Sequence, residues 1–161
     1  MEKLDAQSAL AAAVEEVLET MCFTLLLSSS ALSGPEAAVP GAGFSNPVTA
    51  VLQFEGSPSG EFRLSVPLTV ARGVGSGFLG REPGEVSDCQ AGEVVCELAN
   101  MFCGSVLSRL EAETIFHLSH PELAHPELMP AVPAPDGNAV SRLFELEDGF
   151  FAASLQFRLV S

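Results

Sequence analysis

The stretch that decides the fold is EVVCELANMFCGSVLSRLE, residues 93–111. Its apolar residues recur every three or four positions, the spacing of one face of a helix. The opposite side carries Glu97 and Asn100, which are three residues apart and therefore neighbours on a helix surface. The stretch predicts a helix whose polar side presents a carboxylate beside a carboxamide. At about 100° per residue, its buried side collects Val95, Ala99, Phe102, Val106 and Leu110.

Two long helices are predicted. The stretch above extends to residues 88–111, because Ser87 and Gln90 form a capping-box pattern and Asp88 suits the positive end of a helix. Residues 5–27 form the other helix, since an apolar 3-4-3-4 spacing runs through Leu10, Val14, Val17, Leu18, Met21 and Leu25.

Strands are predicted on both sides of the second helix. Residues 49–67 read as a hairpin around the turn GSPSG, and residues 114–119 read as one strand. Residues 139–161 read as two strands joined at Glu147-Asp148-Gly149. The remaining segments are rich in Ser, Pro and Gly: 28–47, a loop or an irregular piece with one short strand, and 120–138, a connection with a tandem HPEL repeat.

The order of elements favours an α+β fold: two long helices packed on a mostly antiparallel sheet, without βαβ alternation. The two halves echo each other weakly, each giving a long helix and then antiparallel strands. A length of 161 residues with 47% hydrophobic and 17% charged residues fits a single globular domain, residues 1–161.

The charge balance excludes some partners. With 21 Asp and Glu against 7 Lys and Arg, the formal net charge is −14. Phosphate backbones and anionic membrane surfaces attract the opposite sign, so we expect neither nucleic-acid nor membrane binding. The first residues lack a signal-peptide pattern, and the longest apolar runs fall far short of a membrane span. We therefore expect a cytoplasmic protein.

Several other patterns carry little chemistry. The cysteines are predicted to be ordinary buried thiols; three of them recur every seven residues, which does not suit a disulfide. Gly75-x-Gly77-x-x-Gly80 matches a dinucleotide fingerprint formally, but residues 68–80 are followed by Arg81-Glu82-Pro83-Gly84 and lack a βαβ setting. That segment is compatible with a short Gly-rich helix, its glycines serving close packing. The four cysteines are Cys22, Cys89, Cys96 and Cys103.

A histidine cluster raises the question of a metal site. The spacing H-x2-H-x4-H is not a standard zinc pattern, and surface loop histidines are the expected interpretation. Neither a metal site nor Ser/His/Asp catalysis, which would need a nucleophile elbow, is predicted. The residues concerned are His117, His120 and His125, with Glu122 and Glu127 nearby.

From the residues alone, Glu97 and Asn100 have two interpretations. An exposed helix face is ordinarily polar, so they can be a solvated surface. Asn, however, is a poor helix former, and an exposed mid-helix position gives no reason to choose it. Gly104, about one turn further, leaves bare backbone where another surface can approach closely.

The stretch 93–111 resembles the central helix of the CheX/CheC/FliY family of chemotaxis phosphatases, which carries E-x-x-N and then a small residue about a turn later. Glu97, Asn100 and Gly104 match that pattern. FLGREPGEVSD, residues 78–88, resembles the lead-in to that helix, and VEEVLETMCF, residues 14–23, resembles the pattern of the family's first helix. The resemblance touches both long helices and the order of the elements.

The resemblance implies a function and distinct residue roles. The substrate would be a phosphorylated CheY-like receiver domain. Asn100 would orient a water for in-line attack on the aspartyl phosphate, and Glu97 would pair with the receiver's active-site lysine. Glu93, Met101 and Gly104 would contact the receiver. The chain would need no cofactor of its own, since Mg²⁺ would belong to the receiver.

One departure limits the number of sites. CheC-type members carry a second E-x-x-N on the first helix, whereas Glu16-Val17-Leu18-Glu19 stands here. A carboxylate cannot donate to the water and would repel a phosphoryl group. We therefore expect one site per chain, as in CheX-like members, and a homodimer like theirs. Two alternatives stay open: an adaptor that binds phosphorylated receivers without hydrolysis, and a structural domain with a coincidental E-x-x-N.

Overall fold

The structure is a computed structural model that describes residues 3–32, 43–124 and 139–158. Along the chain its elements are α1 (Lys3–Met21), β1 (Ser28–Ala31), β2 (Pro47–Glu55), β3 (Gly60–Pro67), α3 (Leu68–Leu79), a 3-10 turn (Pro83–Glu85), α4 (Asp88–Leu110), β4 (His117–Leu118), β5 (Glu122–Ala124), β6 (Ala139–Leu146) and β7 (Gly149–Phe157).

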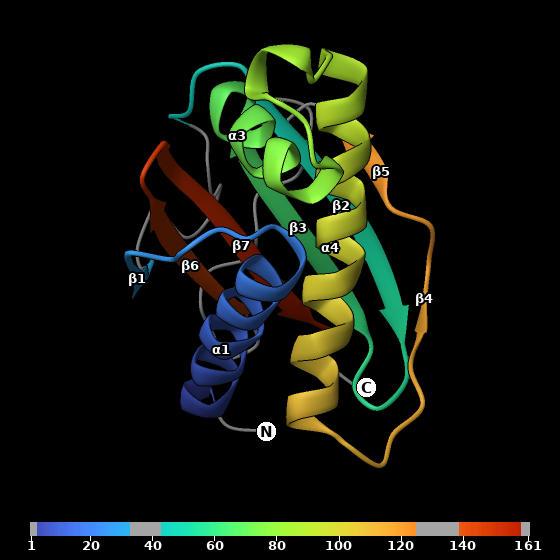
Figure 1. Cartoon of the computed structure of the whole chain (residues 1–161). Coiled ribbons are helices and arrows are strands. Elements are labelled where there is room, and N and C mark those ends of the chain that lie inside the picture. Colours follow the sequence, from blue (N-terminus) through green and yellow to red (C-terminus); the bar gives the residue numbers. More distant parts are fainter. Residues whose placement is uncertain (1–2, 33–42, 125–138, 159–161) are drawn as a thin grey trace.

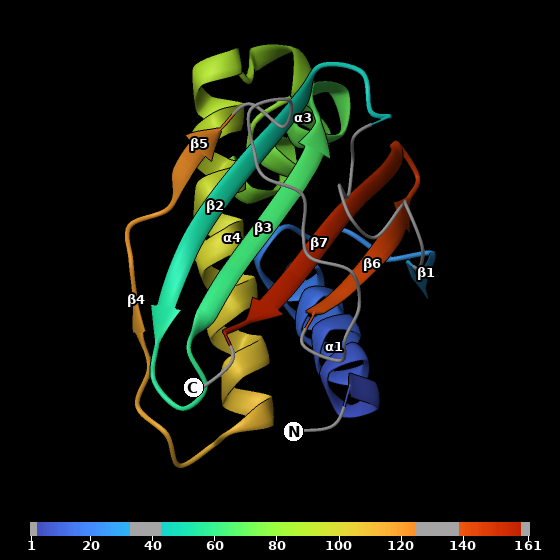
Figure 2. The same cartoon turned by 180° about the vertical axis from the view of Figure 1, so that it is seen from behind.

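The described strands form one antiparallel sheet in the order β1-β6-β7-β3-β2-β4, with β5 also paired to β2. The hairpins β2–β3 and β6–β7 meet at its centre, where β3 pairs with β7. Helices α1, α3 and α4 cover one face (Figure 1), and the strands come forward when the molecule is seen from behind (Figure 2). The predicted α+β class and its two helix-plus-hairpin halves are confirmed, with α3 as a third helix between them.

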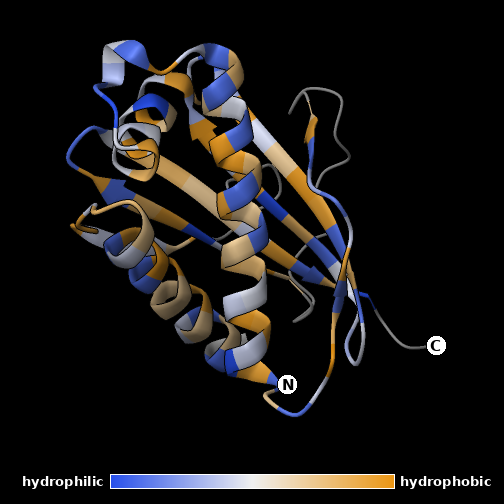
Figure 3. Cartoon of the chain, turned by 45° about the vertical axis from the view of Figure 1, so that its right-hand side comes forward, coloured by the Kyte–Doolittle hydropathy of each residue, from blue (hydrophilic) through white to orange (hydrophobic). Residues whose placement is uncertain are grey.

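The core lies between the helices and the sheet, where alternate residues of each strand point toward α4 and α1. Polar and apolar segments alternate along the helix ribbons, as amphipathic helices require (Figure 3). The predicted capping box starts α4: the Gln90 amide donates to Ser87 Oγ at 3.1 Å, and the Ser87 amide donates to Gln90 Oε1 at 3.0 Å. Such a cap stabilises a helix by about 1 kcal/mol.

The first helix is shorter than its apolar spacing predicts. It ends at Met21, and Leu25, which continues the spacing, is 66% exposed. The Thr24 amide donates to the Leu18 carbonyl at 3.0 Å around Phe23, whose φ is 52°. A residue in the left-handed conformation just past the last turn ends the helix, and Phe23 stands in the position that usually takes Gly. Because no glycine stands there, the end of the helix could not be predicted from sequence.

The segment after α4 also differs from its prediction. Only His117–Leu118 of the strand expected at residues 114–119 pairs with β2. Part of the connection expected at residues 120–138 is a strand: Glu122–Ala124 pairs with β2 and forms β5. The second HPEL copy, with His125 and Glu127, lies outside the described residues.

Residues 68–79 form the short Gly-rich helix α3, and its glycines serve packing. Gly75 and Gly77 lie in the C-terminal half of α3, away from the N-terminal end that binds phosphate in a dinucleotide site. A Cβ on Gly77 would lie 1.8 Å from the Cys22 carbonyl oxygen, so only glycine lets the turn after α1 pass so close. The rejection of a dinucleotide site agrees with this geometry.

The cysteines divide by depth. Cys22 and Cys103 are buried as predicted, Cys96 is half-buried, and Cys89 is exposed, which the prediction of four buried thiols missed. Cys89 is in the first turn of α4 (Figure 1), ahead of Ala91, the first buried residue of that helix. Burial raises the pKa of Cys22 and Cys103 to about 12. Burial raises the pKa of Cys96 as well, with the Glu97 and Glu93 carboxylates adding to it.

Gly77→Ala is expected to destabilise the fold. The gain in helix propensity, about 1 kcal/mol, is outweighed because the new methyl meets rigid backbone rather than a movable side chain. The melting temperature should fall. Gly104→Ala is the matched control, since a Cβ there meets nothing within 4 Å, and it should raise the melting temperature. Equal changes in the two variants would contradict the close approach at Gly77.

The thiols should differ in reactivity with a disulfide reagent at pH 8. The thiolate is the reactive form, and a pKa of about 12 leaves Cys22 and Cys103 almost wholly protonated. We expect Cys89 to react first in the native protein, Cys96 more slowly, and the buried pair only on unfolding. Cysteine-to-serine variants, followed by mass spectrometry, would assign each step. Four thiols reacting at one rate would contradict the structure.

Candidate functional site: a polar ridge on α4

One side of α4 forms a continuous polar strip, which we call the α4 ridge. The opposite side packs against α1, α3, β2 and β3, so the ridge faces away from the core. Glu97 and Asn100 are both exposed near the middle of the helix, as the sequence predicts. The ridge consists of Glu93, Glu97, Asn100, Gly104 and Ser108.

The two central side chains of the ridge are unengaged. Within the described ranges, neither Glu97 nor Asn100 makes a side-chain hydrogen bond or ion pair. The nearby arginines of the helix layer are already paired, Arg109 with Glu16 of α1 and Arg72 with Asp88. The Glu97 carboxylate is therefore available to a cation from another molecule, and the Asn100 carboxamide keeps its donors and its acceptor.

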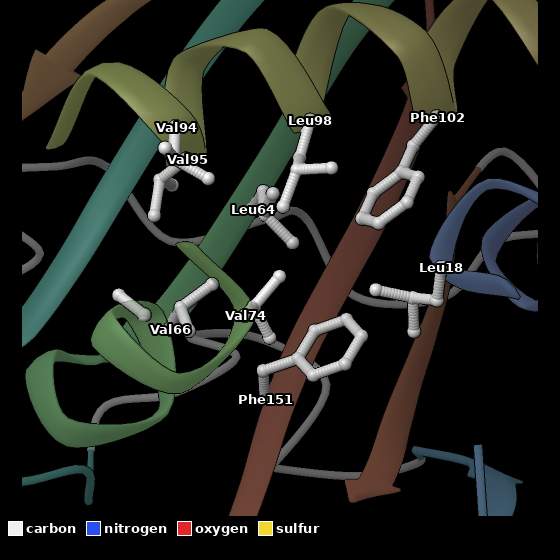
Figure 4. A pocket seen from close by; sticks show the side chains of 10 residues that line it. Leu18, Leu64, Val66, Val74, Val94, Val95, Leu98, Phe102 and Phe151 are labelled. Carbon is white, nitrogen blue, oxygen red and sulfur yellow. The ribbon is translucent and has the colours of Figure 1, made fainter. Parts of the chain in front are cut away.

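The ridge stands on a rigid support. Phe102 of α4 stacks on Phe151 of β7 with ring centroids 6.3 Å apart, and Phe151 stacks on Phe144 of β6 at 4.9 Å. Under α4, side chains from α1, α3, α4 and the sheet converge on an apolar cavity of about 10 Å³ (Figure 4). A cavity of that volume has room for about one water molecule, but its wholly apolar lining offers the water no hydrogen-bond partner. The polar groups of α4 that another molecule can reach are therefore on its outer surface.

Gly104 makes room for no neighbour in the described part of the chain. Other glycines make room for a neighbour, Gly77 for the Cys22 carbonyl and Gly92 for Leu123, whereas a Cβ on Gly104 meets nothing within 4 Å. A mid-helix glycine costs about 1 kcal/mol relative to alanine. Like Asn100, Gly104 weakens the helix without serving the fold.

The other expected contact residues are at the margins of the ridge. Glu93 is exposed, and its Oε1 accepts a weak bond from Cys89 Sγ at 3.8 Å. Met101 is half-buried, with part of its side chain packed on the core. On α1, Glu16 and Glu19 are exposed, and Glu16 is held by Arg109. The position of a second E-x-x-N thus carries two carboxylates, one of them already paired.

One side chain that packs against α4 was not anticipated. Leu123, which the sequence placed in a connection, leans on α4: its Cδ1 would lie 2.9 Å from a Cβ on Gly92. It is nevertheless 55% exposed. The tandem HPEL repeat was the signal available, but a repeat alone does not show that its leucine reaches a helix.

The remaining motifs form no second centre in the part of the chain that the structure describes. His117 and His120 are exposed, and no three His, Cys, Asp or Glu side chains among the described residues gather around a possible metal position. No described helix is both long and apolar enough to cross a bilayer.

Solved structures share this fold over nearly the whole chain. A CheC-like superfamily protein from Shewanella sp. PV-4 is 17% identical, with a TM-score of 0.71 over 97% of this chain and 99% of that one. The chemotaxis protein CheX from Desulfovibrio desulfuricans is 18% identical, with a TM-score of 0.69 over 95% and 99%. The CheX–CheY–BeF3–Mg²⁺ complex from Borrelia burgdorferi contains a chain 19% identical, with a TM-score of 0.66 over 94% and 97%.

At these identities the structural likeness shows the fold alone, and no curated protein matches the chain. The family itself is shown by sequence. The family model described as chemotaxis phosphatase CheX matches residues 48–142, more than half of the chain, and this span contains the whole of α4. The chain therefore belongs to the CheX family of chemotaxis phosphatases.

Proposed function

We propose that this chain hydrolyses the aspartyl phosphate of a CheY-like receiver domain by presenting the α4 ridge to the receiver's active site. One observation carries the proposal: Glu97 and Asn100 are exposed and adjacent, and no described residue engages them, on a helix whose other side is anchored in the core. The family description and the solved complex of a CheX with CheY support the same partner class.

Asn100 is the proposed catalytic residue. Its carboxamide can donate to one oxygen and accept from another, so it can hold a water in line with the phosphorus–oxygen bond to be broken. Attack by that water forms inorganic phosphate and returns the aspartate as a carboxylate. The gain comes from positioning, because phosphoryl transfer needs little covalent chemistry from the protein.

Glu97 is the proposed contact to the receiver's active-site lysine. A carboxylate without an internal partner gains a charge-assisted bond when an ammonium group reaches it. Mg²⁺ is expected at the receiver's own site, where it neutralises phosphoryl charge. Gly104 allows the backbone of α4 to come close to the receiver surface.

Asn100→Ala is expected to abolish most of the phosphatase activity. Loss of one oriented polar group lowers a rate by about 100-fold or more, whereas binding of a receiver carrying BeF3⁻ and Mg²⁺ should remain, because Glu97 is intact. The measurement is release of phosphate from a receiver phosphorylated by a small phosphodonor. The fold should be unaffected, since Asn100 is exposed.

The control for Asn100 is Glu19→Ala, an exposed residue of α1 that should keep full activity if each chain has one site. Equal rates for wild type and Asn100→Ala would overturn the mechanism. A wild-type protein that binds the phosphorylated receiver and leaves its lifetime unchanged or longer would establish the adaptor instead.

Gly104→Leu tests the close approach of the two proteins. A Cβ at this position meets no described atom within 4 Å, so stability should stay near that of Gly104→Ala. Against a receiver, the leucine should hold α4 away and reduce kcat/KM by about tenfold or more, the effect of a steric cost above about 1.4 kcal/mol. Gly104→Ala should fall between wild type and Gly104→Leu. Unchanged kinetics in Gly104→Leu would show that no surface approaches this position.

A further inference from the structure

We propose that a second copy of this chain docks on residues 21–31, which we call the α1–β1 segment. The segment runs from the last residue of α1, through the turn after that helix, to the end of β1 at one edge of the sheet (Figure 1). The inference goes beyond the proposed function and does not rest on it, because the α1–β1 segment and the α4 ridge share no residue.

The α1–β1 segment exposes large apolar side chains in alternation. Phe23 is 83% exposed, Leu25 66% and Leu27 55%. Between them, Cys22 is buried and Leu26 packs against the core. One set of side chains therefore holds the segment on the fold while the other set faces outward. Single exposed leucines are ordinary on a protein surface, but several large apolar residues together mark an interaction site.

Phe23 is unfavourable for the fold in two ways. Its φ of 52° is in the left-handed region, where a bulky side chain crowds its own backbone and where glycine is the usual residue at a helix end. Among the described residues, no large apolar residue is more exposed. A glycine would remove both costs. A strained and exposed residue of this kind points to a role outside the fold.

The edge of β1 lacks the features that ordinarily keep sheet edges from pairing with other chains. Among the described strands β1 ends the sheet order, with β6 as its neighbour. Charged side chains and proline normally protect such an edge, and residues 20–32 contain neither. At the opposite edge, β4 and β5 are two and three residues long, with Pro121 just before β5 and Glu122 within it. The unprotected edge is therefore the one that adjoins the exposed apolar residues.

Hydrogen bonds to β6 hold the unprotected edge in place. The Leu27 amide donates to the Glu145 carbonyl at 2.9 Å, and the Leu32 amide donates to the Ser141 carbonyl at 2.8 Å. These two bonds flank β1, which pairs with β6 along its whole length. A surface that is already ordered loses little conformational freedom when a partner binds.

Charge identifies the partner as a second copy. Each chain has a formal net charge of −14, so two copies repel each other over most of their surfaces. A two-fold contact brings the same residues of both copies together, which favours a surface without charge of its own. Residues 20–32 are such a surface. A basic partner protein would be attracted instead to the acidic remainder of the molecule.

The exposed side chains are large enough to form the centre of such a contact. A stable interface buries about 800 Å² on each partner. A buried aromatic side chain supplies about 150–250 Å², so Phe23 provides roughly a fifth of that area. Leu25, Leu27 and the exposed Met21 add to it.

A second copy at β1 leaves the α4 ridge uncovered. Helix α4 packs on β2 and β3, and β3 is three strands from β1 in the sheet order. At about 4.8 Å between neighbouring strands, this is roughly 14 Å across the sheet. Each copy in the pair therefore keeps its own ridge open to another protein.

The test is the mass of the native protein in solution, measured by light scattering. The wild type should have twice the 16.8 kDa of one chain at micromolar concentrations. Leu25→Glu should reduce the mass to that of one chain, because it sets two carboxylates against each other in the contact. Leu25 is exposed, so this variant should fold, as circular dichroism can check.

The matched control is Ile115→Glu. Ile115 is 80% exposed and lies between α4 and β4, outside the α1–β1 segment. The control introduces the same charge at an apolar residue that is more exposed than Leu25. It should keep the mass of two chains. Equal masses for Leu25→Glu and Ile115→Glu would overturn the proposal, as would a wild type that has the mass of one chain at every concentration.

Phe23→Gly separates the contact from the fold. In the otherwise wild-type chain it should raise the dissociation constant of the pair by about tenfold or more, because a large buried ring is lost. In the Leu25→Glu background, where the chain is a single copy, it should keep or raise the melting temperature, since glycine suits the left-handed conformation. A lower melting temperature there would assign Phe23 to the fold and overturn its role in the contact.

Discussion

The packing of one side of α4 onto the sheet is the constraint on which the rest of the structure depends. Phe102, stacked on Phe151 and through it on Phe144, commits that side of the helix to the interior. Because α4 is one continuous helix, burying one of its sides also determines which residues are exposed on the other. Glu97 and Asn100 are consequently held at the surface by residues that they never touch, and their spacing is that of the helix itself.

Rigidity and exposure rarely coincide on a protein surface, and here both follow from the helix layer. The capping box at Ser87, the apolar contacts under Leu98 and the pairing of Arg109 with Glu16 fix α4 from its start to its end. Residues that weaken the helix, Asn100 and Gly104, stand on its outer side. A fold that is stabilised elsewhere can carry such residues on its surface, and their presence there fits the role proposed for the ridge.

The predictions from sequence succeeded where a strong local pattern exists. The amphipathic period predicted α4 and its two faces, and the capping box predicted its first residue. The turn residues predicted both hairpins. Failures came where distant contacts decide. The end of α1 depends on a left-handed Phe23 and on the passage of Cys22 over Gly77, and β5 forms because β2 offers it an edge. The roles of Glu97 and Asn100, and the homodimer, stay predictions.

By itself, the sequence determined the two helix faces, the α+β class and the pair Glu97–Asn100, because each follows from spacing along a few turns of chain. Only the tertiary structure decided that no described residue engages the pair or fills the space at Gly104, and that Leu123 packs against α4 at Gly92. These are relations between residues far apart in the chain. They depend on how strands and helices are placed against one another, which no local periodicity encodes.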